Sequence, residues 1–362
     1  MPLETPLLAQ HQSAGAEIGE YFGTLLPTRF VDFSPEYAAA RRAVGLVDSN
    51  YRAVFSFSGP DAQRYLNAVL TSNVRDLKPG MGTVGLLLTP QGHILAELET
   101  LAQADGILAV SHGMVRERTL STFNKFIIMD DVALEDRTPS TATLDLVGPR
   151  AGALISELAG ADITSMAPFS HIEATVGMIS CLIVRHTWVD HPAAMLIVAR
   201  EHLTPLWKEL ESRARAHGGS PAGMQAINSL RLESGDAWFG HDFDDKNIPH
   251  EAGLEHSHIS YEKGCYTGQE IVERVRSRGH ANRRLSSLQF LAANPPAPGT
   301  KLLIDGNEIG HVTSAGFSPV LGRRIGLGYV RREHSAISTR VDASGIPAEV
   351  IAPPLLAKKP SA

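Results

Sequence analysis

The sequence contains very little cysteine. Only Cys181 and Cys265 occur among 362 residues, so disulfides cannot organise the fold, and we expect a reducing compartment. Long hydrophobic runs are also missing, because the longest apolar stretches, such as Met195–Ala199, are far too short to cross a bilayer. The first 23 residues hold three glutamates and no sustained apolar run, which is not typical of a signal peptide. These absences predict a cytoplasmic protein without membrane contact.

Positive charge is scarce as well. The 33 Lys and Arg residues face 39 Asp and Glu residues, and the net charge is −6. This balance excludes a globally basic surface of the kind that holds nucleic acid or anionic membranes. The content of 43% hydrophobic and 20% charged residues is typical of globular proteins. At roughly 150 residues per domain, the length predicts two or three domains.

Two stretches of the sequence share one order of elements. A predicted strand ends at Gly59-Pro60 and a helix follows to Leu70, and a second strand, Thr143–Val147, ends at Gly148-Pro149 before a helix to Leu158. This similarity indicates a weak internal repeat, although chance also explains a match of so few residues.

The pattern changes from Leu285 onward. Leu302–Ile304 and Glu308–Val312 flank Asp305-Gly306-Asn307, a combination that predicts a hairpin with a tight turn. Further short strands among glycines and prolines, such as Ile325–Val330, favour a small antiparallel barrel or sandwich.

One octapeptide, Lys263–Glu270, stands apart in its chemistry; it reads Lys-Gly-Cys-Tyr-Thr-Gly-Gln-Glu. Thr267 and Glu270 have the spacing of a capping box, which places Cys265 just before a predicted helix N-terminus. The helix dipole and the neighbouring lysine would stabilise a thiolate there. Two interpretations are open: a reactive or ligand-donating thiol, or a small apolar cysteine buried in the core.

Five arginines follow the octapeptide within eleven residues. They could bind a phosphate or polyanion through bidentate contacts, or form a solvated helix face paired with glutamates. No aromatic residues are interleaved with them, so we expect at most a weak contact with tRNA or another anion. The residues are Arg274, Arg276, Arg278, Arg283 and Arg284. The His and Asp residues between His241 and His258 match no metal-ligand spacing, and no metal site is predicted.

The octapeptide resembles the K-G-C-Y-x-G-Q-E signature of YgfZ-type folate-binding proteins, in the superfamily of the glycine-cleavage T-protein, an aminomethyltransferase. The resemblance extends over about residues 31–353 through Ser58–Ala62, Lys78–Gly80, Arg231–Gly235, Ile248–Ala252 and Ile325–Val330. It implies an α+β fold, with T-protein-like αβ lobes around a central folate cavity in residues 1–284 and an internal junction near 139–149. A small antiparallel β-barrel is implied for residues 285–357.

The resemblance also implies a function. A YgfZ-type protein is a folate-binding accessory protein for the assembly or maintenance of iron–sulfur clusters and cluster-dependent enzymes, including the tRNA methylthiolase. The expected cofactor is tetrahydrofolate or a related reduced folate, and the expected partners are iron–sulfur proteins or their assembly machinery. Cys265 is the implied functional thiol. The implied helpers that set its loop and charge are Lys263, Gln269 and Glu270.

Folate contacts are expected from three residues: Tyr51, Arg231 and Glu233. Each also has a structural interpretation, Tyr51 as a core aromatic and the other two as a strand-edge or helix-surface pair.

The alternative function is that of a folate-dependent aminomethyltransferase or demethylase, so that one-carbon transfer is the expected reaction if the chain is catalytic. Two departures from the T-protein weigh against it. The T-protein has adjacent aspartates after a hairpin glycine, whereas Ala96-Glu97 stands here. The T-protein also has a G-Y-T-G-E segment whose Glu contacts the pterin, and Arg185-His186-Thr187-Trp188 occupies that place without the Glu.

Overall fold

In the computed structural model, which describes residues 1–188 and 191–353, the chain forms two compact units. Unit 1 comprises Met1–Leu87, Leu95–Ile227 and His258–Thr267. Unit 2 comprises Leu88–Ile94, Asn228–Ser257 and the chain from Gly268 onward. The first strand of the barrel begins at Arg283, beside the boundary expected at residue 284, and the compact unit that contains the barrel also includes earlier segments. Residue 357 lies outside the described residues. No described helix is long and apolar enough to span a bilayer.

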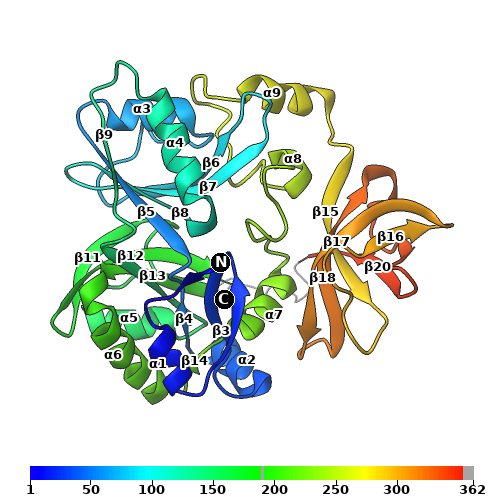
Figure 1. Cartoon of the computed structure of the whole chain (residues 1–362), viewed down its shortest axis with the longest axis horizontal. Helices are drawn as coiled ribbons and strands as arrows, with labels where there is room; N and C mark the ends of the chain where they lie inside the picture. Colours follow the sequence, from blue (N-terminus) through cyan, green and yellow to red (C-terminus); the bar gives the residue numbers. More distant parts are fainter. Residues whose placement is uncertain (189–190, 354–362) are drawn as a thin grey trace. The chain divides into compact units, whose positions relative to one another are not determined.

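The first sheet of unit 1 has five strands in the order β6-β7-β8-β5-β9 (Figure 1). An aromatic cluster connects the helices α3 and α4. The hydroxyl of Tyr65 on α3 donates to the carbonyl of Phe123 on α4 at 2.7 Å, and the ring of Phe57 on β5 contacts that of Phe123 edge to face. The elements are β5 (Arg52–Ser58), α3 (Ala62–Val69), β6 (Gly82–Leu88), β7 (Ile94–Ala102), β8 (Ile107–His112), a 3-10 turn (Gly113–Val115), α4 (Arg116–Phe126) and β9 (Ala133–Asp136).

The second sheet of unit 1 has six strands in the order β11-β12-β13-β10-β4-β14. Apolar residues of α5 and α6, among them Leu154, Trp207 and Leu210, belong to its core. The elements are β4 (Gly45–Asp48), β10 (Thr141–Val147), α5 (Ala151–Ala159), β11 (His171–Val176), β12 (Ile179–Trp188), β13 (His191–Ala199), a 3-10 turn (Arg200–His202), α6 (Leu203–Ala216) and β14 (Ser220–Pro221).

The predicted internal repeat is confirmed as a repeat of local structure. Gly59 and Gly148 each end a strand with a positive φ, 101° and 103°, and each precedes a helix, α3 or α5. A Cβ atom would lie 2.3 Å from the Asp131 carbonyl oxygen at the first site and 2.5 Å from the Ala40 carbonyl oxygen at the second. Both positions therefore require glycine, for conformation and for space.

The two sheets of unit 1 pack against each other through an apolar interface. Val54 on β5, Leu101 on β7 and Val110 on β8 meet residues of the other sheet, including Val184 on β12 and Met195 on β13. Because these side chains are buried in one apolar cluster, the interface fixes the relative position of the two sheets.

A small three-stranded sheet at the N-terminus, in the order β1-β3-β2, completes unit 1. The segment that follows β1 makes a fully buried polar contact with β4, in which His11 Nε2 lies 2.8 Å and Thr5 Oγ1 lies 2.6 Å from Asp48 Oδ2. This contact fixes the N-terminal segment to the end of β4. The elements are β1 (Leu3–Glu4), α1 (Leu8–Ser13), β2 (Glu17–Tyr21), β3 (Thr24–Arg29) and α2 (Phe33–Arg42).

Unit 2 contains the predicted antiparallel barrel, which is closed and has the strand order β15-β18-β17-β16-β19-β20, coloured yellow to red in Figure 1. The hairpin turn between β16 and β17 has positive φ at Asp305 and Gly306, as a tight hairpin turn requires. The strands are β15 (Arg283–Phe290), β16 (Lys301–Ile304), β17 (Asn307–Ser318), β18 (Arg323–Arg331), β19 (Arg340–Asp342) and β20 (Pro347–Ile351), and a 3-10 turn (Arg332–His334) follows β18.

Three helices precede the barrel: α7 (Met224–Ser234), α8 (Pro249–Ala252) and α9 (Gln269–Arg278). The predicted capping box between Thr267 and Glu270 is wrong, because the N-cap of α9 is Gly268, with φ 83° and no side-chain cap. A Cβ atom at Gly268 would lie 2.7 Å from the Thr89 carbonyl oxygen. Close packing on the Leu88–Ile94 segment, rather than local capping, therefore sets the start of this helix.

Candidate functional site

Polar residues replace apolar ones at one end of the interface between the two sheets of unit 1. Alternate residues of a strand share a face, so the positions two or four residues from the apolar contacts point toward the same interface. These positions hold Arg52 on β5, Glu97 and Glu99 on β7, His112 on β8 and His186 on β12.

Two ion pairs cross from one sheet to the other at this polar end. Arg52 Nη1 lies 2.9 Å from Asp145 Oδ1 on β10, and His186 Nε2 lies 2.9 Å from Glu99 Oε2. Burial raises the pKa of Glu99, but His186 and Arg52 outweigh burial and leave that pKa below its ordinary value. The polar end is therefore held by charge, whereas the other end is held by apolar packing.

Glu97 is the centre of a carboxylate–imidazole cluster. Its Oε1 lies 2.9 Å from His258 Nε2, and its Oε2 lies 3.5 Å from His112 Nε2. The Glu97 side chain retains 24% exposure and that of His258 11%. Burial raises the pKa of Glu97, but hydrogen bonds with the two imidazoles outweigh burial and lower the pKa well below its ordinary value. Glu97 is therefore an ionised, half-buried acceptor at neutral pH.

The segment that carries His258 is fixed to the first sheet through its backbone. Thr71 Oγ1 donates to the His258 carbonyl at 2.6 Å and accepts the Leu86 N–H at 2.8 Å. The spacing of the histidines from His241 to His258 bears only on metal binding, and it does not predict the contact of His258 with Glu97. Two acidic residues at alternate positions, Glu97 and Glu99, interrupt the largely apolar sequence of a mostly buried strand. This pattern could have indicated the cluster.

Tyr51 lies beside this cluster, as one of the three residues predicted to bind folate. Its ring stacks on Phe22 with centroids 4.3 Å apart and lies 5.6 Å from the ring of His112. Burial raises the pKa of the Tyr51 hydroxyl to about 12, so it stays protonated. Together with Asn50 and Arg116, Tyr51 lines a pocket of about 330 Å³ in unit 1.

Arg231 and Glu233, the other two predicted folate ligands, lie in unit 2 and are fully buried. Arg231 Nη1 lies 2.6 Å from Asp242 Oδ2, and its guanidinium lies over the ring of Trp238. Glu233 accepts a hydrogen bond from Ser318 on β17 at 2.5 Å. These contacts connect α7 to the barrel, and they offer no support for folate binding by either side chain.

Lys263 is buried in unit 1 and holds the end of helix α3. Its Nζ donates to the carbonyls of Asn67, Leu70 and Ser72, the last at 2.9 Å. Burial lowers the pKa of Lys263 to about 8, so at neutral pH all three ammonium hydrogens remain available. Its Nζ also lies 5.0 Å from the centre of the buried Tyr266 ring. Lys263 therefore fixes the backbone of the octapeptide through main-chain contacts.

Cys265 lies between these two buried neighbours and is exposed. The interpretation of this residue as a buried apolar cysteine is wrong, and it describes Cys181 instead, which is 2% exposed. The octapeptide thus presents a free thiol on a turn whose flanking side chains are anchored in the core.

Gln269 and Glu270 begin helix α9, in unit 2, whereas Cys265 belongs to unit 1. The Glu270 side chain is 85% exposed and pairs with Arg274 at 2.9 Å, which is a helix-surface ion pair.

The arginines predicted to bind an anion are largely occupied by neighbouring glutamates. Their ion pairs are Arg274 with Glu270, Arg276 with Glu273, Arg283 with Glu251 and Arg284 with Glu255. The side chain of Arg278 lies outside the described ones. The arrangement therefore favours the solvated, internally paired face over a site for tRNA.

Two protein-family models match this chain, one over its N-terminal region and one over its C-terminal barrel. The model of the GCVT N-terminal domain matches residues 7–260, and that of the glycine cleavage T-protein C-terminal barrel domain matches residues 283–356. The chain belongs to the glycine cleavage T-protein family. Full-length matches within this family agree with that assignment.

Two curated relatives are named aminomethyltransferase. That of Streptomyces coelicolor is 30% identical and the match covers 97% of this chain and 96% of the relative. That of Rubrobacter xylanophilus is 27% identical, with 98% and 94% covered. The crystal structure of the glycine cleavage system aminomethyltransferase T from Bartonella henselae superposes with a TM-score of 0.88 at 23% identity, covering 98% of each chain, which shows a shared fold.

Proposed function

We propose that this chain binds a reduced folate and catalyses the transfer of a one-carbon unit, with Glu97, His258 and His112 as its proton-transfer group. The half-buried carboxylate between two imidazoles carries the proposal. Curated relatives named aminomethyltransferase support the same reaction class. This ranking reverses the one made from the sequence, which placed the iron–sulfur accessory role first.

The polar end of unit 1 has the chemistry that a reduced pterin needs. A pterin ring carries N–H and amino donors along one edge together with oxygen and nitrogen acceptors. Glu97 and Glu99 supply acceptors, Arg52 supplies donors, and Tyr51 supplies an aromatic wall. Tetrahydrofolate would supply the nitrogen atoms that accept the one-carbon unit.

The residues of the cluster have two separate roles, orientation of an imidazole and transfer of a proton. The Glu97 carboxylate orients the His258 imidazole and stabilises its protonated form, as a carboxylate does for an imidazole in other catalytic pairs. The imidazole can then take up a proton from a reacting amine and return it to a leaving group. Because Glu97 itself stays ionised, it acts as the positioning group and the imidazoles carry the proton.

The test is turnover of an aminomethyl-lipoyl carrier by the purified protein, in which tetrahydrofolate takes up the carbon as methylenetetrahydrofolate, ammonia is released and the lipoyl thiol is freed. Glu97→Gln keeps the shape of the side chain and removes its charge, and turnover should fall by roughly 10²-fold or more. Glu173→Gln makes the same change at an exposed position of β11 in the same unit and should leave turnover unchanged. Wild-type turnover in Glu97→Gln, or no turnover by a wild-type protein that binds tetrahydrofolate, would contradict the proposal.

A second candidate function is favoured by the exposed thiol of Cys265. The narrower resemblance to YgfZ-type proteins points to an accessory role for iron–sulfur proteins in which this thiol is required. Lys263 and Tyr266 anchor its turn on both sides, which would present the thiol to a partner protein in a fixed place.

Complementation separates the two candidates. In cells that lack this protein, Cys265→Ser should fail to restore the activity of cluster-dependent enzymes such as the tRNA methylthiolase, whereas the buried-site control Cys181→Ser should restore it. Glu97→Gln should also restore it if the thiol alone matters. Full restoration by Cys265→Ser would reject the accessory role.

A further inference from the structure

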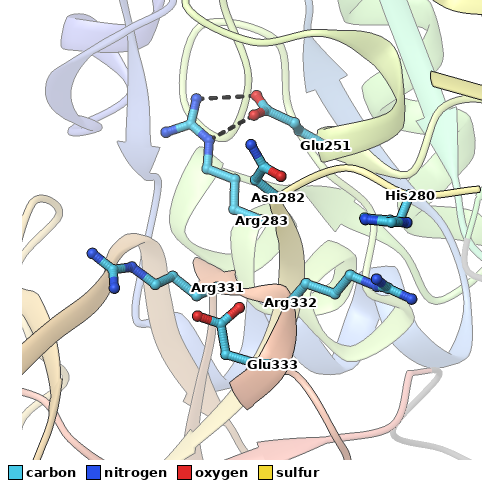
Figure 2. A pocket seen from close by; sticks show the side chains of 7 residues that line it. All are labelled: Glu251, His280, Asn282, Arg283, Arg331, Arg332 and Glu333. Atoms are coloured by element: carbon cyan, nitrogen blue, oxygen red, sulfur yellow. Dashed lines mark hydrogen bonds and ion pairs between the residues drawn. The ribbon is translucent and has the colours of Figure 1, made fainter. Parts of the chain in front are cut away.

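Unit 2 contains a pocket of about 880 Å³ where the first residue of β15 and the last residue of β18 lie close together (Figure 2). The Arg332 N–H donates to the Asn282 carbonyl at 2.9 Å, so the two chain segments stay paired beyond the strands. All seven lining residues are charged or polar. Such a wall favours a charged or polar ligand, and the volume is that of a small-molecule site.

One charge pair in this pocket is already satisfied. Arg283 Nε lies 3.0 Å from Glu251 Oε1, and Arg283 Nη2 lies 3.0 Å from Glu251 Oε2, a bidentate contact drawn as dashed lines in Figure 2. The Arg283 guanidinium also lies 4.8 Å from the centre of the Tyr329 ring. This pair contributes no net charge, and it makes one wall of the pocket rigid.

The remaining basic side chains of the pocket have no carboxylate partner of this kind. The side chains of Arg331, Arg332 and His280 are exposed and form no hydrogen bond or ion pair with any side chain that the structure describes. In Figure 2, Arg332 and His280 extend to one side of the pocket and Arg331 to the other. Glu333 is the remaining acid of the wall, so two guanidinium groups face one carboxylate. The arginines of the lining therefore outnumber its glutamates, and the wall carries a net positive charge, although Arg331 also interacts with Glu308 outside the lining.

We propose that this pocket binds an oxyanion bearing phosphate or carboxylate groups through Arg332 and His280, which extend to the same side of it, with Arg331 adding positive charge from the other side. Guanidinium groups bind such oxygens with paired hydrogen bonds, and His280 adds a further donor. Arg331 and Arg332 lie outside the predicted stretch Arg274–Arg284, whose described arginines are paired with glutamates. No aromatic side chain lines the pocket, so base stacking does not contribute.

The test is calorimetric titration of the full chain with inorganic pyrophosphate and, separately, with citrate, which together distinguish phosphate from carboxylate recognition. The wild-type chain should bind one equivalent of at least one of them. Arg331→Gln/Arg332→Gln should weaken that binding by about tenfold or more. The matched control Arg323→Gln/Arg340→Gln removes the same charge from exposed barrel positions and should bind as the wild type does.

A third variant tests the position of the anion. Glu333→Gln removes the competing carboxylate and should tighten binding by about threefold or more, because like charges in one pocket repel. The proposal fails if neither anion binds with saturation, if the control pair loses as much affinity as the test pair, or if Glu333→Gln leaves the affinity unchanged. These measurements do not depend on one-carbon transfer, so they succeed or fail separately from the proposed function.

Discussion

His258 Nε2 and Glu97 Oε1 are 2.9 Å apart, although 161 positions separate the two residues in the chain. The contact joins a loop to the middle of β7, and Thr71 fixes that loop by a backbone hydrogen bond. The strand fixes the carboxylate and the loop anchor fixes the imidazole. The two groups therefore keep one relative geometry, which proton transfer requires.

Glu97→Gln should lower the free energy of unfolding at pH 7 by about 1.5–3 kcal/mol, because hydrogen bonds to a charged carboxylate become neutral ones. The pKa of Glu97 lies below its ordinary value of 4.5 in the folded chain. Its contribution is therefore fully present above pH 4.5 and is lost as the pH falls through the lower folded value. The difference between the two proteins in urea unfolding should shrink below about pH 4.5; a difference that stays constant with pH would contradict this.

Asp242→Asn should destabilise unit 2 by about 3–5 kcal/mol, because it leaves the buried Arg231 guanidinium without its charged partner. The double variant Arg231→Met/Asp242→Asn removes both charges and should recover part of that loss in chemical unfolding. Tetrahydrofolate affinity of the folded double variant should match the wild type. Loss of binding there would instead assign Arg231 a direct contact with folate.

Lys263→Met removes the ammonium that holds three carbonyls at the end of α3, and should lower the free energy of unfolding by about 1.5–3 kcal/mol. It should also speed amide hydrogen exchange in the turn around Cys265. Glu262→Gln, at the exposed neighbouring position, is the matched control. Equal exchange rates in the two variants would mean that Lys263 does not anchor the turn.

Native protein should react with one equivalent of a disulfide reagent such as dithionitrobenzoate, and denatured protein with two. Cys265 is exposed, whereas Cys181 is buried and burial raises the pKa of its thiol to about 11. The fast phase should disappear in Cys265→Ser and persist in Cys181→Ser. Two fast equivalents in the native protein would show that Cys181 is accessible.

Features set by neighbouring residues were predictable from the sequence. The Asp305-Gly306 turn and the Gly59 and Gly148 breaks depend on local backbone conformation, and the structure has them where they were expected. The start of α9 did not follow its local pattern, because Gly268 packs against a distant carbonyl that the capping-box spacing does not reveal.

Most of the candidate site was not predictable in this way. The cluster of Glu97, His112 and His258 depends on contacts between distant segments, and one sequence carries no record of them. Arg231 and Glu233 show a second limit, because sequence reasoning treats charged residues as exposed or functional, and it did not predict that these two are buried in contacts with Asp242 and Ser318.

The place of β4 has a consequence for how the chain is synthesised. β4 precedes the whole five-stranded sheet in sequence, yet it pairs with β10, where Asp48 lies opposite Leu144, and with β14 later still. At about 5–20 residues per second, a ribosome delivers β10 roughly 5–20 s after β4. The four buried residues of β4 therefore wait without a sheet while the first lobe folds. During that interval β4 is an unpaired strand, the kind of segment that can pair with another nascent chain.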